Sequence, residues 1–163
     1  MFVKMSPPVY LILLFPFMSQ VCSTLDIVEN FEIEFEQIDV EVQPNDLVSP
    51  KCMGCICQVE SHCLPIGCRM DVGSLSCGPF QIKKGYWTDC GSPGGDYETC
   101  TRDYTCSYNC VQRYMARYIK FSGCLKNCES YARIHNGGPR GCTNPNTMGY
   151  WKKMESKGCT PYR

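Results

Sequence analysis

The chain has 163 residues and a formal net charge of zero, because 16 Lys plus Arg balance 16 Asp plus Glu. The balance hides an asymmetry: residues 24–51 carry eight acids and one base, whereas residues 52–163 carry 14 bases and eight acids. A basic domain favours anionic partners such as bacterial walls, acidic glycans or membrane surfaces. Nucleic acid would also fit the charge, but the sequence contains no recognition motif for it, so we expect no nucleic-acid partner.

Residues 1–23 are predicted to be a secretory signal peptide. Lys4 precedes a mostly apolar run over residues 9–18, and small residues follow at Cys22 and Ser23. This run is too short to span a bilayer, so it does not predict a membrane span. The alternative is an ordinary buried N-terminal helix. We expect cleavage after Ser23 and a soluble, secreted, extracellular protein.

Residues 24–51 alternate acidic with apolar side chains and contain no cysteine. A period of two could form a strand, but the charge density and the Gln43-Pro-Asn-Asp46 ending favour a solvated linker or tail. A second interpretation is an acidic pro-segment that lies on the basic domain behind it.

Cysteine dominates the rest of the chain. Loss of Cys22 with the signal peptide turns 15 cysteines into 14, between Cys52 and Cys159. An even, dense set in a secreted chain predicts seven disulfides, whose pairing cannot be read from spacing. The alternative is a zinc site at Cys52-x-x-Cys55-x-Cys57, but an oxidising route pairs thiols before a metal binds them. No metal and no cofactor is expected.

The first predicted elements are a helix over 53–62, a hairpin over 71–82 and a short helical turn over 83–89. Residues 65–67 break the helix with Pro and Gly, and Gly73 and Gly78-Pro79 mark the turns of the hairpin. The Gly-, Pro- and Asp-rich stretch 91–103 is predicted to be a loop.

Three helices are predicted to follow. The first, over 107–120, and the second, over 124–135, each place apolar residues on one face. The third begins at Asn144 as N-cap and ends before Gly158. The residues expected on the apolar faces are Tyr108, Val111, Met115, Tyr118, Leu125, Cys128, Tyr131, Ala132 and His135. The order of elements predicts an α+β domain with a modest core that depends on its disulfides.

Two acids stand out between Cys55 and Cys90. Glycosidases need one protonated carboxyl as general acid and one ionised carboxylate as nucleophile or stabiliser. Glu60 lies near a helix end, among residues that would desolvate it and raise its pKa: Ile56, Cys57, Val59 and Cys63. Asp71 lies near Gly73 and Ser74, whose backbone amides and hydroxyl could keep it ionised. The alternatives are a solvated Glu60 and a turn-capping Asp71.

Several motifs resemble the invertebrate-type lysozymes, a family that includes the leech destabilase. They are Cys-x-Cys-x-x-Glu60-Ser61, Cys68-Arg-Met-Asp71-Val-Gly-Ser74-Leu-Ser-Cys77-Gly, Phe80-Gln-Ile-Lys83, Tyr86-Trp87-x-Asp89-Cys90 and Tyr131-Ala-Arg-Ile-His135-Asn-Gly-Gly-Pro-Arg-Gly-Cys142. The resemblance spans Cys52 to Cys159, and residues 24–51 lie outside it. It implies a small, disulfide-rich, lysozyme-like α+β domain over residues 52–163.

The resemblance also implies a function and a site. The function is hydrolysis of the β-1,4 bond between N-acetylmuramic acid and N-acetylglucosamine in bacterial peptidoglycan, in an antibacterial or digestive setting. Glu60 matches the family's general acid and Asp71 its second carboxylate. The residues that match the wall of the sugar cleft are Lys83, Lys84, Gly85, Tyr86, Trp87, Thr88, Asp89, Tyr131, His135, Asn136 and Gly137. The alternatives are core packing for Tyr86 and Trp87 and a helix-end cap for His135.

Other interpretations remain open. Some family members cleave isopeptide bonds with a serine and a lysine that match Ser74 and Lys83, which requires a lysine that can deprotonate the hydroxyl. The simpler interpretation is that Ser74 binds the hairpin backbone and Lys83 attracts anionic substrate. A third possibility is a cationic, wall-binding antimicrobial protein without enzymatic activity. His62 stands where relatives often carry glycine, and its charge could lower the pKa of Glu60.

Overall fold

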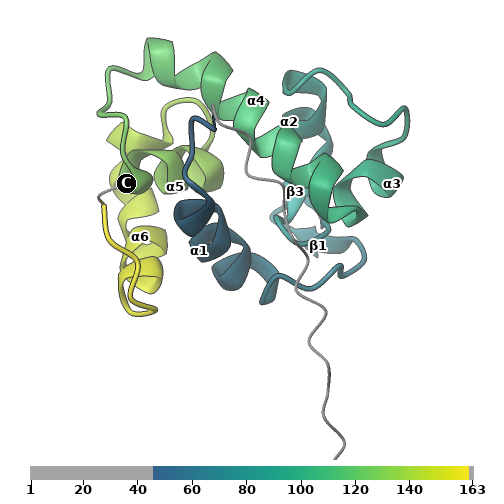
Figure 1. The fold of residues 1–163 in the computed structure, drawn as a ribbon, viewed down its shortest axis with the longest axis horizontal. Helices are drawn as coiled ribbons and strands as arrows, with labels where there is room; N and C mark the ends of the chain where they lie inside the picture. Colours follow the sequence, from purple (N-terminus) through teal and green to yellow (C-terminus); the bar gives the residue numbers. More distant parts are fainter. Residues whose placement is uncertain (1–45, 162–163) are drawn as a thin grey trace, which may run out of the picture. The chain divides into compact units, whose positions relative to one another are not determined.

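The computed structural model describes residues 46–161 (Figure 1). The predicted signal peptide and the acidic segment up to residue 45 lie outside the described residues. The elements in chain order are α1 (Pro50–Ser61), β1 (Arg69–Asp71), β2 (Ser74–Cys77), β3 (Ile82–Lys83), α2 (Lys84–Asp89), α3 (Tyr97–Arg102), α4 (Tyr104–Ser122), α5 (Cys128–Gly137), the 3-10 helices η1 (Gly141–Thr143) and η2 (Pro145–Thr147), and α6 (Met148–Glu155). The predicted α+β class is confirmed.

Helix α1 starts earlier than predicted because Ser49 caps it and Pro50 occupies its first position. The Ser49 hydroxyl accepts a hydrogen bond from the Cys52 amide, which satisfies a donor that the first turn would otherwise leave free. Val48, just before the cap, is fully buried, and its backbone exchanges two hydrogen bonds with the Gln112 side chain on α4. The folded domain therefore begins before Cys52.

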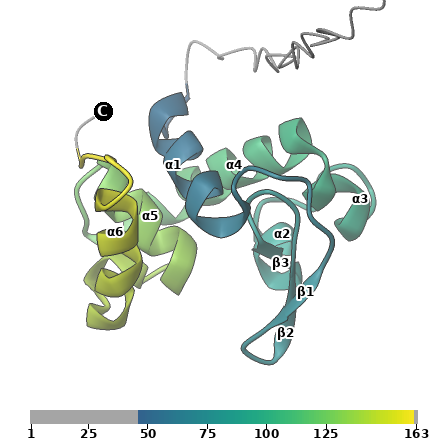
Figure 2. The same ribbon diagram turned by 90° about the horizontal axis from the view of Figure 1, so that it is seen from below.

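The predicted hairpin is present and extends into a small antiparallel sheet in the order β1-β2-β3. Asp71 pairs with Ser74 across the turn at Val72 and Gly73, and Ser76 pairs with Lys83 on the next strand. The second turn needs glycine, because Gly78 has φ of +74° and a Cβ there would lie 1.6 Å from the Thr101 carbonyl oxygen. Figure 2 shows the β1–β2 hairpin projecting from the helices.

The prediction of a loop over 91–103 was wrong in part, because residues 97–102 form α3. Asp96 caps this helix by accepting from the Thr99 amide at 2.8 Å. The short helix is held from outside: Cys100 forms a disulfide with Cys106, and the Tyr97 hydroxyl donates to the carbonyls of Leu75 and Ile82. A six-residue helix needs such tertiary contacts, because its own hydrogen bonds do not stabilise it.

The later helices differ from prediction mainly at their ends. Helix α4 starts at Tyr104, capped by Asp103, and ends where Gly123 adopts φ of +72°. The α5 helix starts four residues later than predicted, capped by Asn127, so Leu125 lies outside any helix and is 76% exposed. Its predicted place on an apolar face was therefore wrong. Asn144 does act as an N-cap, but for η2, and α6 begins only at Met148.

Seven disulfides join the 14 cysteines within residues 46–161, as predicted: Cys52–Cys128, Cys55–Cys159, Cys57–Cys63, Cys68–Cys77, Cys90–Cys110, Cys100–Cys106 and Cys124–Cys142. Two of them tie α1 to α5 and to the C-terminal segment. Within residues 46–161 no cluster of His, Cys, Asp or Glu could hold a metal ion. None of the helices described is both long and apolar enough to cross a membrane.

The core lies where α1, α4, α5 and α6 meet. Its largest fully buried side chains are Tyr131, Phe80, Met53, Ile56, Ile82, Met115, Ile134 and Met154. Gly141 permits the close approach of η1 to α5, because a Cβ there would lie 1.8 Å from the Arg133 carbonyl oxygen. This packing fixes α1 and α5 side by side, and so fixes Glu60 against the second half of the chain.

Candidate active site

A cleft of about 730 Å³ opens between the end of α1, the hairpin and α2. Residues from several helices and strands contribute to its walls. They are Glu60, Asp71, Ser74, Leu75, Gln81, Lys83, Lys84, Gly85, Tyr86, Tyr97, Glu98, Tyr114, His135, Asn136 and Gly138. The two acids singled out in the sequence therefore face the same space.

Glu60 sits in the last turn of α1, and its side chain is only 19% exposed. Burial raises its pKa from 4.5 to about 7, because desolvation disfavours the carboxylate. This is the direction expected from its apolar neighbours, of which Ile56 and Cys57 are fully buried. The negative charge of Asp71 raises the pKa further, while Tyr150 and Lys153 lower it. Below pH 7 the group is therefore mainly protonated.

The contribution of Tyr150, on α6, was not foreseen. Its buried hydroxyl lies near the Glu60 carboxyl and lowers the pKa of that group, although the two make no hydrogen bond of good geometry. Burial and the proximity of Glu60 together raise the pKa of Tyr150 well above 10, so the hydroxyl keeps its proton. The two side chains are far apart in the sequence, and no local signal links them.

His135, on α5, forms the inner wall of the cleft beside Glu60. Its Nε2 lies 3.0 Å from the Phe80 carbonyl oxygen, which can only accept, so Nε2 carries the proton. Nδ1 then accepts from the Tyr86 hydroxyl at 3.2 Å. Burial lowers the pKa of His135 to about 4, so the ring is neutral near pH 6 and its 3.5 Å approach to Glu60 is not an ion pair there. The expected alternative, a helix-end cap, does not describe these contacts.

Asp71 has the opposite environment to Glu60. Its side chain is 55% exposed at the end of β1, and its Oδ2 pairs with Lys83 Nζ at 3.1 Å. The Ser76 hydroxyl donates to the same oxygen at 3.5 Å. The Asp71 carboxylate is thus surrounded by solvent, a cation and a hydroxyl. These partners differ from those expected, since they come from Ser76 and Lys83 across the sheet.

The Lys83 ammonium makes two contacts with Asp71: the ion pair with the carboxylate and a hydrogen bond that it donates to the backbone carbonyl at 2.9 Å. Ser74 lines the cleft nearby, but among the described hydrogen bonds none joins its hydroxyl to Lys83. Both described contacts of the Lys83 ammonium are with Asp71, so neither places it to take a proton from the Ser74 hydroxyl. The isopeptidase dyad stays a prediction.

The residues predicted for the sugar-binding wall divide into two groups. Six of them line the cleft: Lys83, Lys84, Gly85, Tyr86, His135 and Asn136. Five do not line it: Trp87, Thr88, Asp89, Tyr131 and Gly137. The indole of Trp87 donates to the Pro93 carbonyl, the Thr88 hydroxyl donates to the Lys84 carbonyl, and Tyr131 is a core residue that is 2% exposed.

Other residues of the cleft were not foreseen. Tyr97 and Glu98 lie on α3, the helix that the sequence did not predict, and Tyr114 lies on the inner face of α4. Tyr114 stacks on Tyr86 with ring centroids 3.5 Å apart. The i, i+3 spacing of Val111 and Tyr114 was a usable signal for burial, though not for a place in the cleft. His62 is the exposed, left-handed cap of α1 and is not among the groups that shift the pKa of Glu60.

Comparison with known proteins shows the family to which the chain belongs. The Destabilase family model matches residues 49–157, which is more than half of the chain. The chain belongs to the destabilase family of invertebrate-type lysozymes. The resemblance seen in its motifs is thereby confirmed.

Individual relatives agree with this assignment. The chain is 63% identical to lysozyme 1 of Crassostrea virginica over 113 residues, which cover 69% of this chain and 61% of that protein. It is 56% identical to an invertebrate-type lysozyme of Ruditapes philippinarum over 115 residues, covering 69% and 85% of the two chains. A crystal structure of Tapes japonica lysozyme matches with a TM-score of 0.70 and 53% identity, covering 73% of this chain and 98% of that one. The matched family fold therefore includes the whole cleft.

Proposed function

We propose that this protein is a lysozyme that hydrolyses the β-1,4 bond between N-acetylmuramic acid and N-acetylglucosamine of bacterial peptidoglycan. Membership of a family whose relatives are named lysozymes supports the glycosidase activity. The roles proposed for the two acids are supported by one observation. A buried Glu60, whose pKa is about 7, and a solvent-exposed Asp71, which is ion-paired with Lys83, line the same cleft. Retaining glycosidases require this division between two carboxyl groups.

In the proposed reaction Glu60 is the general acid. Its protonated carboxyl donates to the glycosidic oxygen as the bond breaks, which spares the leaving sugar a negative charge. Asp71, ion-paired with Lys83, forms or stabilises the glycosyl intermediate on the other side of the sugar. Glu60, now a carboxylate, then takes a proton from the attacking water, and the product keeps the configuration of the substrate. A lysozyme of a different family is the type case of this chemistry.

The neutral His135 supports this assignment. A cationic ring 3.5 Å from Glu60 would stabilise the carboxylate and lower its pKa, so the acid would lose its proton too early. The bonds from the Tyr86 hydroxyl and to the Phe80 carbonyl hold the ring in one tautomer. Polar groups around the cleft are available for sugar hydroxyls and acetamido groups, namely Gln81, Lys84 and Asn136.

The disulfides bear on where the protein is located. Seven disulfides fit an extracellular protein, because such bonds persist in oxidising compartments. We propose that residues 1–23 direct secretion and are removed, and that the enzyme acts on walls in an antibacterial or digestive role. The amino-terminal sequence of the secreted protein tests this, and a chain that still begins at Met1 would contradict it.

Turbidity clearing of bacterial cell walls tests the proposed activity. Glu60→Gln should lower the rate by about a hundredfold or more, the usual effect of losing a general acid. Glu98→Gln is the matched control, because Glu98 lies in the same cleft but on the exposed side of α3. It should keep most of the activity. Near-normal lysis by Glu60→Gln, or equal loss in both variants, would remove Glu60 from the proposed role.

A further inference from the structure

The corner between α4 and α5 exposes two large apolar side chains. Phe121, in the last turn of α4, is 84% exposed, and Leu125, four residues later, is 76% exposed. Exposed apolar surface that is contiguous often marks a binding site on a folded protein. Val72 is also exposed, at 92%, but it lies in the turn between Asp71 and Ser74, two residues that line the cleft.

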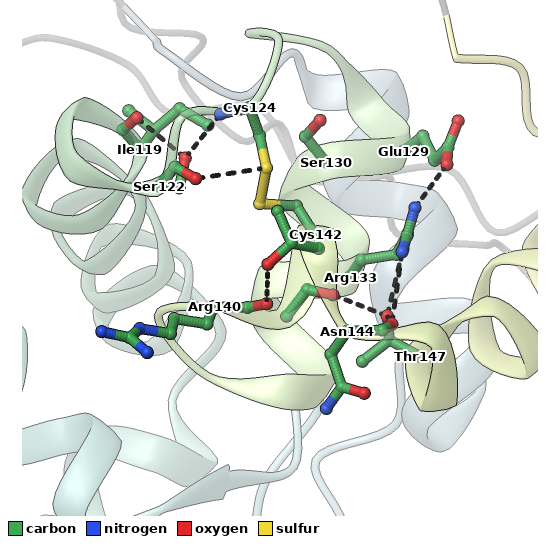
Figure 3. Close-up of a disulfide and its surroundings, with 12 residues drawn as sticks. Ile119, Ser122, Cys124, Glu129, Ser130, Arg133, Arg140, Cys142, Asn144 and Thr147 are labelled. Atoms are coloured by element: carbon green, nitrogen blue, oxygen red, sulfur yellow. Dashed lines mark hydrogen bonds and ion pairs between the residues drawn. A yellow bond between two sulfur atoms is a disulfide. The ribbon is translucent and has the colours of Figure 1, made fainter.

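This corner is well fixed, so the exposure is not that of a loose chain end. The Ser122 hydroxyl donates to the Ile119 carbonyl at 3.0 Å and accepts from the Cys124 amide at 3.2 Å. Gly123, with φ of +72°, turns the chain out of the helix. The Cys124–Cys142 disulfide then ties the corner to η1 (Figure 3). A preformed surface loses little conformational entropy when it binds.

The chain around the two apolar side chains carries only basic charges, and one acid from another element faces it: Asp89 of α2 lies beside Arg117, whose guanidinium donates to the Asp89 backbone carbonyl at 3.1 Å. Residues 104–128 contain no Asp or Glu and four bases, a net charge of +4: Arg113, Arg117, Lys120 and Lys126. The first three follow the i, i+4, i+7 spacing of one helical face, and Phe121 lies four residues beyond Arg117 on that side. The next acid, Glu129, is already paired with Arg133 at 2.9 Å. Within residues 104–128 no carboxylate offsets the positive charge, and Asp89 reaches only the Arg117 end of the corner, away from Lys120 and Lys126 in the sequence.

We propose that this basic apolar corner, formed by Arg113, Arg117, Lys120, Phe121, Leu125 and Lys126, is a binding site for an anionic lipid surface. Phe121 and Leu125 enter the boundary between headgroups and acyl chains, and the four bases contact anionic headgroups. The combination selects lipid over a purely polar polyanion, because a polyanion would engage the bases but leave both apolar side chains in water.

The position of the corner leaves the enzyme free to work while bound. None of the six residues lines the cleft. The nearest cleft residue on the same helix is Tyr114, and Phe121 lies seven residues further on, roughly 10 Å along the helix axis. In Figure 1 the corner is at the end of α4 remote from α3 and the sheet. Lipid binding therefore adds to the proposed glycosidase function and does not depend on it.

Cosedimentation with lipid vesicles tests the site. The protein should bind vesicles that contain phosphatidylglycerol in phosphatidylcholine, and bind pure phosphatidylcholine vesicles much more weakly. A double change, Phe121→Ser with Leu125→Ser, should weaken binding by at least about tenfold, because two large apolar groups no longer leave water. The matched control is Leu64→Ser, since Leu64 is 55% exposed but lies in the segment between α1 and β1. That variant should bind as the unchanged protein does.

A second pair of changes tests the charges. Lys120→Gln with Lys126→Gln should weaken binding to the anionic vesicles by about tenfold and reduce its sensitivity to salt. All variants should hydrolyse a small chito-oligosaccharide in solution at the rate of the unchanged protein. That rate reports on the cleft alone, so loss of catalysis and loss of lipid binding can be told apart.

Three results would overturn the proposal. The first is no binding of the unchanged protein to the anionic vesicles. The second is unchanged vesicle binding by the Phe121 and Leu125 double variant, which would reduce the effect to non-specific charge attraction. The third is binding to a dissolved polyanionic wall polymer that is as tight as vesicle binding and equally lost in both double variants, which would assign the corner to that polymer.

Discussion

Replacing Glu60 by Gln should stabilise the protein in a way that depends on pH. Between pH 4.5 and about 7 the folded protein holds a proton on Glu60 that the unfolded chain has released, because burial raises the pKa from 4.5 to about 7. The free energy of unfolding therefore falls as pH rises through this range. The difference between the two pKa values corresponds to about 3 kcal/mol. Glutamine has no proton to lose, so the variant avoids this cost.

The expected gain is about 3 kcal/mol at pH 8 and close to zero at pH 4. In thermal unfolding a gain of this size raises Tm by roughly 10 °C for a domain of this length. Chemical unfolding with the disulfides intact, at both pH values, measures the free energy directly. Glu98→Gln, on the surface of α3, is the control and should change stability by less than about 0.5 kcal/mol at either pH.

Because His135 also makes stability depend on pH, the stability of Glu60→Gln must be compared with that of the unchanged protein at each pH. Burial lowers the pKa of His135 from 6.5 to about 4. Between these pH values the unfolded chain binds a proton at His135, whereas the folded protein does not. Its contribution to stability is therefore lost as pH falls from 6.5 towards 4, opposite in sign to that of Glu60. The two effects oppose each other in the unchanged protein. An equal stability difference between Glu60→Gln and the unchanged protein at pH 4 and pH 8 would refute the raised pKa.

Three further predictions concern the site and its framework. Tyr150→Phe should move the alkaline limb of the pH dependence of kcat/KM to higher pH, because Tyr150 lowers the pKa of Glu60; an unmoved limb would show that the hydroxyl does not act on it. Ser74→Ala should retain wall lysis, and if isopeptidase activity coexists it should abolish cleavage of a γ-glutamyl-lysine substrate; lost lysis in a folded variant would show that Ser74 serves the glycosidase. The intact mass of the secreted protein should lie 14 hydrogens below that of the reduced chain, since seven disulfides are formed, and free thiols would contradict this.

Local signals in the sequence were sufficient for much of the fold. Caps and turns act over three or four residues, so the hairpin turn at Gly73 and the cap at Asn144 were found by spacing alone. Helix α3 was missed because its stability comes from the Cys100–Cys106 disulfide and from the Tyr97 hydroxyl, which reaches the sheet. Leu125 was misplaced because its spacing to Cys128 continues the periodic pattern of the second helix back beyond Asn127, the cap at which α5 begins.

In the candidate site, too, features set by residues close in sequence could be predicted, and features set by tertiary packing could not. The upward shift of the Glu60 pKa could be predicted because its apolar neighbours Ile56 and Cys57 are close in sequence. The groups that complete its environment could not, since Tyr150 and His135 reach it only through the packing of α5 and α6. For the same reason the sequence did not separate Tyr86, which lines the cleft, from the adjacent Trp87, which turns away.

The central claim is that Glu60 supplies a proton to the leaving sugar, and a substrate with an activated leaving group tests it most directly. A dinitrophenyl glycoside of a chito-oligosaccharide releases a phenolate that needs no protonation, so a general acid is dispensable for its release. Glu60→Gln should therefore lose about a hundredfold or more in kcat/KM on cell walls and less than about tenfold in release of the phenolate. Equal losses on both substrates would contradict the account, because they would show that Glu60 maintains the cleft and does not donate the proton.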